Sequence, residues 1–141
     1  MALATGRYIY LEASDIHRDT TSRLISATVY PSGPSCLTFW YYMYGSGMGT
    51  LNIVIPWSDG DEQLWSRSGD QGNQWIQSLV DITILENYTI VFEGIRGISY
   101  RSDIALDDIF FVSGPCEGIA LTTFACIYVK NTICDTHVIY I

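Results

Sequence analysis

Three aspartates, Asp103, Asp107 and Asp108, lie in an otherwise largely apolar stretch, RSDIALDDIFF, at residues 101–111. Strict alternation along an extended strand places Asp108 in a row of apolar side chains, between Leu106 and Phe110. An ionised carboxylate there is costly unless it is paired, hydrogen-bonded or bound to a metal. A β-bulge at Asp107 and Asp108 would also remove the cost, because it would turn the pair away from the apolar row.

Two interpretations of this aspartate pair remain open. In the first, Asp107 and Asp108 accept hydrogen bonds from backbone amides or pair with Arg96 or Arg101, and so fasten the strand to a neighbouring turn. In the second, they hold a hard cation such as Ca²⁺, which takes roughly six to eight carboxylate and carbonyl oxygens. We expect the structural role to be the main one in this chain.

Catalysis has less support in the sequence. A serine or cysteine nucleophile needs a histidine base, and the chain has only His17, in a polar loop, and His137, near its end. Glu93 and the three aspartates are candidates for the two carboxylates of a glycosidase, but the alternating E-x-D-x-x-E pattern of jelly-roll glucanases is absent. We therefore predict that the chain is not an enzyme.

Tryptophans suggest a noncatalytic alternative, a lectin-like sandwich that binds carbohydrate. Trp57, Trp65 and Trp75 offer ring faces on which sugars can stack. Trp75 lies in NQWIQSLV among alternating apolar positions, which favours a place in the core. The sequence leaves the positions of Trp57 and Trp65 open.

Composition indicates one globular domain with ample core material, because the 141 residues are 48% hydrophobic and 13% aromatic. The net charge of −8 repels phosphate backbones and anionic lipid, so cations or basic surfaces are the better partners. The N-terminus lacks the pattern of a signal peptide. The apolar run at residues 119–129 is too short to span a bilayer, so we expect neither nucleic-acid binding nor membrane insertion.

The periodicity predicts strands throughout the first 112 residues and no helix. The predicted strands are short, rich in aromatic and β-branched residues, and separated by turn formers, which is typical of an all-β sandwich. They cover residues 7–13, 21–26, 36–44, 50–55, 63–66, 74–82, 88–95 and 104–112. CLTFWYYMY, at residues 36–44, carries bulky groups on both alternating faces, which predicts a central strand covered on both sides. GSGMG is expected to be a hairpin connection, and SGDQGN a turn in which Gly69 and Gly72 adopt positive φ.

Several motifs then occur in a familiar order: CLTFWYYMYGSGMGTLNIVI, LWSRSGDQGNQWIQSLVDI and YTIVFEGIRGISYRSDIALDDIFFVSGPC. Together with GRYIYLEAS near the start, they resemble the MAM domain, an extracellular module named for meprins, neuropilin and receptor tyrosine phosphatases. The resemblance covers residues 6–116. Residues 117–141 match nothing in the family, and we treat them as an unassigned tail.

The resemblance implies a jelly-roll-like antiparallel β-sandwich that acts as a noncatalytic binding module. Such modules serve cell adhesion or the oligomerisation of a larger receptor or secreted protein, so we expect an extracellular location and a protein partner or self-association. A complete domain has opening strands that this chain lacks, so residues 1–116 are expected to be an N-terminally incomplete domain with exposed sheet edges. No cofactor is expected, except Ca²⁺ at Asp107 and Asp108 in a complete domain.

The resemblance also implies a disulfide between Cys36 and Cys116, which match the third and fourth cysteines of the family. Pairing of Cys126 with Cys134 stays open. Asn87 begins an N-x-[ST] sequon, NYT, at the turn before a predicted strand. In a secreted protein such a turn is an accessible site for N-glycosylation.

Overall fold

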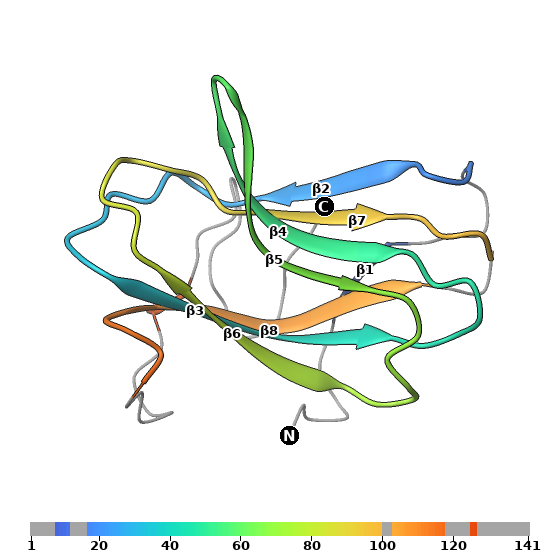
Figure 1. Ribbon diagram of the computed structural model, residues 1–141. Coiled ribbons are helices and arrows are strands. Elements are labelled where there is room, and N and C mark those ends of the chain that lie inside the picture. Colours follow the sequence, from blue (N-terminus) through green and yellow to red (C-terminus); the bar gives the residue numbers. More distant parts are fainter. Residues whose placement is uncertain (1–7, 12–16, 100–102, 118–124, 127–141) are drawn as a thin grey trace.

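The computed structural model describes residues 8–11, 17–99, 103–117 and 125–126. These residues form two antiparallel β-sheets that lie face to face (Figure 1). The predicted fold class, an all-β sandwich, is therefore confirmed. Among the described residues there is no helix long and apolar enough to cross a membrane.

One sheet has five strands in the order β1-β8-β3-β6, with β9 also paired to β8, and the other has four strands in the order β2-β7-β4-β5. The strands are β1 (Ile9–Leu11), β2 (Thr21–Ile25), β3 (Ser35–Met43), β4 (Thr50–Trp57), β5 (Gly60–Ser68), β6 (Ile76–Ile82), β7 (Val91–Ile95), β8 (Ile104–Ser113) and β9 (Ala125–Cys126). Each of the eight segments predicted to be extended overlaps one of the first eight strands, but β3, β4, β5 and β8 extend beyond the predicted bounds.

The ninth strand lies in the segment that we treated as a tail. Its two residues pair with Phe110 and Phe111 of β8, so part of this segment adds to the five-stranded sheet. The rest of it, including Cys134 and His137, lies outside the described residues apart from Glu117. The domain boundary at residue 116 and the missing opening strands stay predictions.

The core fills the space between the sheets and is centred on Phe39 of β3, which is completely buried. Its ring meets two rings of the opposite sheet edge to face, with centroid distances of 5.2 Å to Trp65 and 5.3 Å to Phe92. Leu37, Tyr41 and other inward-facing residues surround it. Contacts of this kind are worth about 0.5–1.5 kcal/mol each beyond the area they bury, so Phe39 ties the two sheets together.

The strand that carries Phe39 lies between β8 and β6, as predicted for a central strand. Its inward row is buried, but the prediction that both faces are covered is wrong for part of the outward row. Trp40 and Tyr42 are half-buried, and Tyr44, just beyond the strand, is 47% exposed. The outer face of this strand is covered near Cys36 and open near Tyr44.

The connection at residues 45–49 is not a hairpin, as we had expected, because β3 and β4 belong to different sheets. It crosses the edge of the sandwich and contacts residues 96–99, where the backbone N–H of Ile98 donates to the carbonyl oxygen of Gly47 at 2.9 Å. A Cβ on Gly97 would collide with that same oxygen. Glycine is required there because the two backbones touch.

The loop between β5 and β6 has the predicted geometry, with φ of 78° at Gly69 and 85° at Gly72. The carboxylate of Asp70 accepts from the backbone N–H groups of Gly72 at 2.9 Å and Gly45 at 3.3 Å. The true hairpin of this region is the one that joins β4 to β5, which extends beyond the body of the sandwich at the top of Figure 1.

The disulfide predicted between Cys36 and Cys116 is present, with a Cα–Cα distance of 4.9 Å. Cys36 is fully buried at the start of β3, and Cys116 follows the end of β8. The backbone N–H of Cys116 also donates to the carboxylate of Asp81 in β6 at 2.6 Å. Together these bonds hold the segment after β8 against the outer face of the five-stranded sheet.

Replacing both cysteines, Cys36→Ser with Cys116→Ser, should lower the free energy of unfolding by roughly 4.5 kcal/mol. The bridge closes a span of 80 residues, so its loss returns considerable entropy to the unfolded chain. Urea unfolding under nonreducing conditions measures the change. Reduced wild-type protein is the control and should match the variant, whereas equal stability of variant and oxidised wild type would contradict the prediction.

Candidate functional site

A β-bulge lies where the two adjacent aspartates occur in β8. Trp40 of β3 pairs with Asp107, but Thr38 pairs with Phe110, so Asp108 and Ile109 together lie opposite the single residue Phe39. Asp108 has φ of 47° and is exposed. Aspartate adopts this left-handed conformation more readily than most residues. Of the arrangements that would avoid burying the charge of Asp108, the structure therefore shows the β-bulge.

The bulge changes which side chains of β8 face the core. Leu106 points inward before it, while Ile109 and Phe111 pack against the core after it. The expected apolar row, in which Asp108 precedes Phe110, is therefore wrong. The extra residue shifts the alternation by one position, and Asp108 reaches solvent without any cost of burial.

The described contacts of the two aspartates are structural. The Oδ1 atom of Asp107 accepts a hydrogen bond from the backbone N–H of Asp108 at 2.8 Å, which supports the bulge. Asp103, just before β8, is half-buried. Within the described residues, no three His, Cys, Asp or Glu side chains gather into a group that could hold a metal. Pairing with Arg96 or with Arg101, which lies outside the described residues, stays a prediction.

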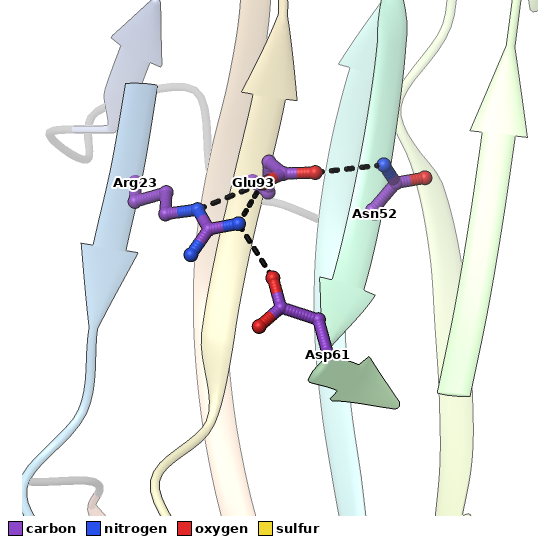
Figure 2. A network of polar contacts seen from close by, with 4 residues as sticks. All are labelled: Arg23, Asn52, Asp61 and Glu93. Carbon is purple, nitrogen blue, oxygen red and sulfur yellow. Dashed lines mark hydrogen bonds and ion pairs between the residues drawn. The ribbon is translucent and has the colours of Figure 1, made fainter. Parts of the chain in front are cut away.

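The acids considered for glycoside cleavage do not come together, because Glu93 belongs to the four-stranded sheet and Asp103, Asp107 and Asp108 to the five-stranded sheet or its edge. Glu93 is instead part of a polar row on the outer face of its sheet (Figure 2). Its carboxylate accepts from Arg23 Nε at 2.7 Å and from Asn52 Nδ2 at 3.1 Å.

The polar row crosses all four strands of that sheet. Arg23 of β2 donates to Asp61 of β5 at 2.6 Å, and Ser66 of β5 donates to Asn52 of β4 at 2.7 Å. Hydrogen bonds to Glu93, and secondarily to Asp61, raise the pKa of Arg23. Arg23 keeps 41% of its side chain exposed, so solvent weakens these ion pairs, and their main effect is to fix the register of the strands.

Sequence reasoning missed this row. The sequence contained a signal, because Arg23, Asn52 and Ser66 occupy outward positions of their strands. Each of them has a polar or oppositely charged partner on a neighbouring strand. Reading it required the cross-strand pairing of Arg23 with Glu93 and of Glu93 with Asn52, which joins segments far apart in the sequence.

Tyr88 is another titratable group with a shifted pKa. Its side chain is 3% exposed, and its hydroxyl makes no hydrogen bond of ordinary geometry within the described residues. Burial raises the pKa of this phenol, and the nearby hydroxyl of Ser35 opposes the effect in part. The phenol is therefore neutral in the folded protein and contributes to the core.

Of the three tryptophans considered as sugar-stacking residues, Trp75 lies on a different face from the one that we expected. Trp57 and Trp65 pack against the core, so neither offers a fully open ring. Trp75, which we expected in the core, is half-buried on the outer face of the five-stranded sheet, because Ile76 takes the inward position beside Tyr41. Its ring contacts Tyr42 and Tyr8, with centroids 5.6 and 5.7 Å away.

Trp75 thus belongs to a group of rings that we call the aromatic face, made up of Tyr8, Tyr10, Tyr42, Tyr44 and Trp75. Tyr8, Tyr10 and Tyr44 are 55%, 49% and 47% exposed. Large apolar groups gathered on one surface are a common mark of an interaction site. His17 and Asn87 are exposed elsewhere, and glycosylation of Asn87 stays a prediction.

The fold defines a class of protein, the antiparallel β-sandwich. A solved structure, a Family 16 Carbohydrate Binding Module-2, has the same fold, with a TM-score of 0.51 at 10% identity over 77% of this chain and 87% of that one. At such low identity the likeness concerns the fold alone.

The family follows from the sequence comparison. Residues 2–117 match the MAM domain, meprin/A5/mu, and the chain belongs to this family of extracellular interaction modules. It is 41% identical to MAM domain-containing protein 2 of Homo sapiens and 39% identical to neuropilin-1 of Xenopus laevis, over 84% and 77% of its length. It is also 39% identical to MAM domain-containing glycosylphosphatidylinositol anchor protein 1 of Gallus gallus over 79% of its length. The chain spans only 18%, 12% and 12% of these three relatives.

The bulge predicts that Asp108 affects stability and not calcium affinity in this chain. Asp108→Val should lower the free energy of unfolding by about 1–2 kcal/mol, because a β-branched residue resists the left-handed conformation. Asp108→Gly is the control and should change it by less than about 0.5 kcal/mol. Thermal unfolding of each variant with and without Ca²⁺ measures both effects. Tight calcium binding that Asp108→Asn abolishes would refute the prediction.

Proposed function

We propose that this chain is a noncatalytic extracellular module that mediates adhesion or assembly of a larger protein by binding another protein. The observation that carries the proposal is that residues 2–117 of this chain match the MAM domain. The relatives that share this domain are several times longer than this chain. A module of this kind contributes a surface to a larger architecture. The proposal includes neither binding of nucleic acid nor insertion into lipid, because a net charge of −8 repels phosphate backbones and anionic lipid.

An extracellular location has independent support from the disulfide between Cys36 and Cys116, because disulfides persist in oxidising compartments. The name of the Gallus gallus relative includes a glycosylphosphatidylinositol anchor, which is consistent with an ectodomain. We propose that this chain occupies the same side of the membrane.

The surface with the properties of a binding site is the aromatic face. It joins residues that lie in or next to β1, β3 and β6, and three of its rings, Tyr8, Tyr10 and Tyr44, are about half exposed. The carbohydrate-binding alternative loses support, because two of the three tryptophans proposed to stack on sugars pack against the core.

Binding to cells tests the proposed function. Beads coated with this chain should bind to a subset of cultured cells, and trypsin treatment of the cells should remove the binding because the partner is a protein. Enzymatic removal of cell-surface glycans should leave it unchanged. The opposite pattern, loss with glycosidases and survival of trypsin, would establish the lectin-like alternative instead. Clumping of coated beads without cells would indicate self-association.

Asn87 provides a separate prediction about location. Its side chain is exposed beside the isolated bridge at Tyr88, so a secreted chain should carry an N-linked glycan there. Mass spectrometry before and after enzymatic deglycosylation measures it. The variants Asn87→Gln and Thr89→Ala should both lack the glycan, since each destroys the sequon. An unchanged mass for wild-type protein from a eukaryotic secretory host would contradict this prediction.

A further inference from the structure

The outer face of the five-stranded sheet is divided into two halves. At one end, Cys116 and its bond to Asp81 cover the surface above Cys36. At the other end lies the aromatic face. Tyr10 pairs with Ala105, and Ala105 pairs with Tyr42, so these residues form one row across three strands.

The rings of the aromatic face support one another. Tyr42 contacts Tyr44 in a T-shaped arrangement at 6.3 Å, and its hydroxyl donates to the side-chain oxygen of Asn73 at 2.8 Å. Tyr8 contacts both Tyr10 at 6.1 Å and Trp75 at 5.7 Å. Rings held in this way lose little conformational entropy when a ligand binds.

Among the described residues, the charged side chains in the strands of this sheet have one sign. The strands of the five-stranded sheet contain Asp81, Asp107 and Asp108 and, among their described residues, no lysine or arginine. The described arginines lie in or beside strands of the other sheet: Arg18, Arg23, Arg67 and Arg96. With a net charge of −8 for the chain, the aromatic face lies in a negative field that attracts cations.

We propose that the aromatic face binds arginine side chains of a basic segment in the protein partner. The inference rests on the proposed function and names the chemistry of the partner. A guanidinium group stacks on tyrosine and tryptophan rings, and phenol oxygens can accept its hydrogen bonds. The chain already contains one such contact, in which Arg67 lies over the ring of Trp65 at 5.1 Å.

Other occupants fit the surface less well. A second copy of this chain, placed face to face, would bring the Asp107 and Asp108 side chains of both copies onto one interface, and like charges there oppose binding. A neutral sugar would use the rings but gain nothing from the negative field. A guanidinium group uses both features.

Capped peptides of alternating glycine and arginine test the inference against the full chain. Matched peptides carry lysine or citrulline in place of arginine, since citrulline keeps the shape of arginine without its charge. Calorimetric titration should show the arginine peptide binding most tightly, lysine more weakly and citrulline weakest. The double variant Tyr10→Ala with Tyr44→Ala should weaken binding of the arginine peptide by about tenfold.

Two controls separate recognition from general attraction. Tyr30→Ala removes a tyrosine that is 76% exposed in the loop between β2 and β3, and it should leave the affinity unchanged. Tyr44→Trp keeps a ring at the site and should retain binding. Thermal unfolding of every variant verifies the fold.

Equal binding of the arginine peptide to wild type and to the double variant would overturn the inference, because charge alone would then explain the affinity. Equal binding of the citrulline peptide would overturn it too, as would a neutral oligosaccharide or self-association that depends on Tyr10 and Tyr44. The proposed function has a separate readout. If coated beads of the double variant still bind to cells by a trypsin-sensitive route, the inference fails and the function stands.

Discussion

The structure depends on the packing of Phe39 between the two sheets. Its ring meets Trp65 and Phe92 of the opposite sheet edge to face, and β8 places two residues, Asp108 and Ile109, opposite it. Because of this bulge, apolar side chains of β8 face the core on both sides of Phe39 while a charged residue reaches solvent. Asp107 and Asp108 suggest a metal site in the sequence, but their positions in the structure follow from the way β8 passes the buried ring of Phe39.

The two outer faces of the sandwich use different chemistry. On the four-stranded sheet, Arg23, Glu93 and Asn52 form hydrogen bonds with one another across the strands (Figure 2). The polar groups of this surface therefore serve to fix the register of its strands. On the five-stranded sheet, the aromatic face includes three rings that remain about half exposed. A surface whose polar groups are already paired has less to offer a partner, and the aromatic face is therefore the binding surface that we propose.

The ends of the sandwich are held by contacts between segments distant in sequence. The bond between Cys36 and Cys116 fastens one end, and the backbone contact between Gly47 and Ile98 fastens the other. Residues 45–49, at the second contact, cross from one sheet to the other. A module with closed ends can be inserted into a longer chain without losing its own packing, which suits relatives that are several times longer.

The sequence by itself determined the fold class and the positions of eight strands, because alternation and turn residues act over a few neighbouring positions. The cysteine pair needed the family order of motifs as well. Only the tertiary structure decided the bulge at Asp108, the crossing at residues 45–49 and the outward position of Trp75. In NQWIQSLV both alternating rows contain apolar residues, so composition could not tell which row faces the core. That choice depends on pairing with β3, a strand more than thirty residues earlier, and such long-range register is invisible to local patterns.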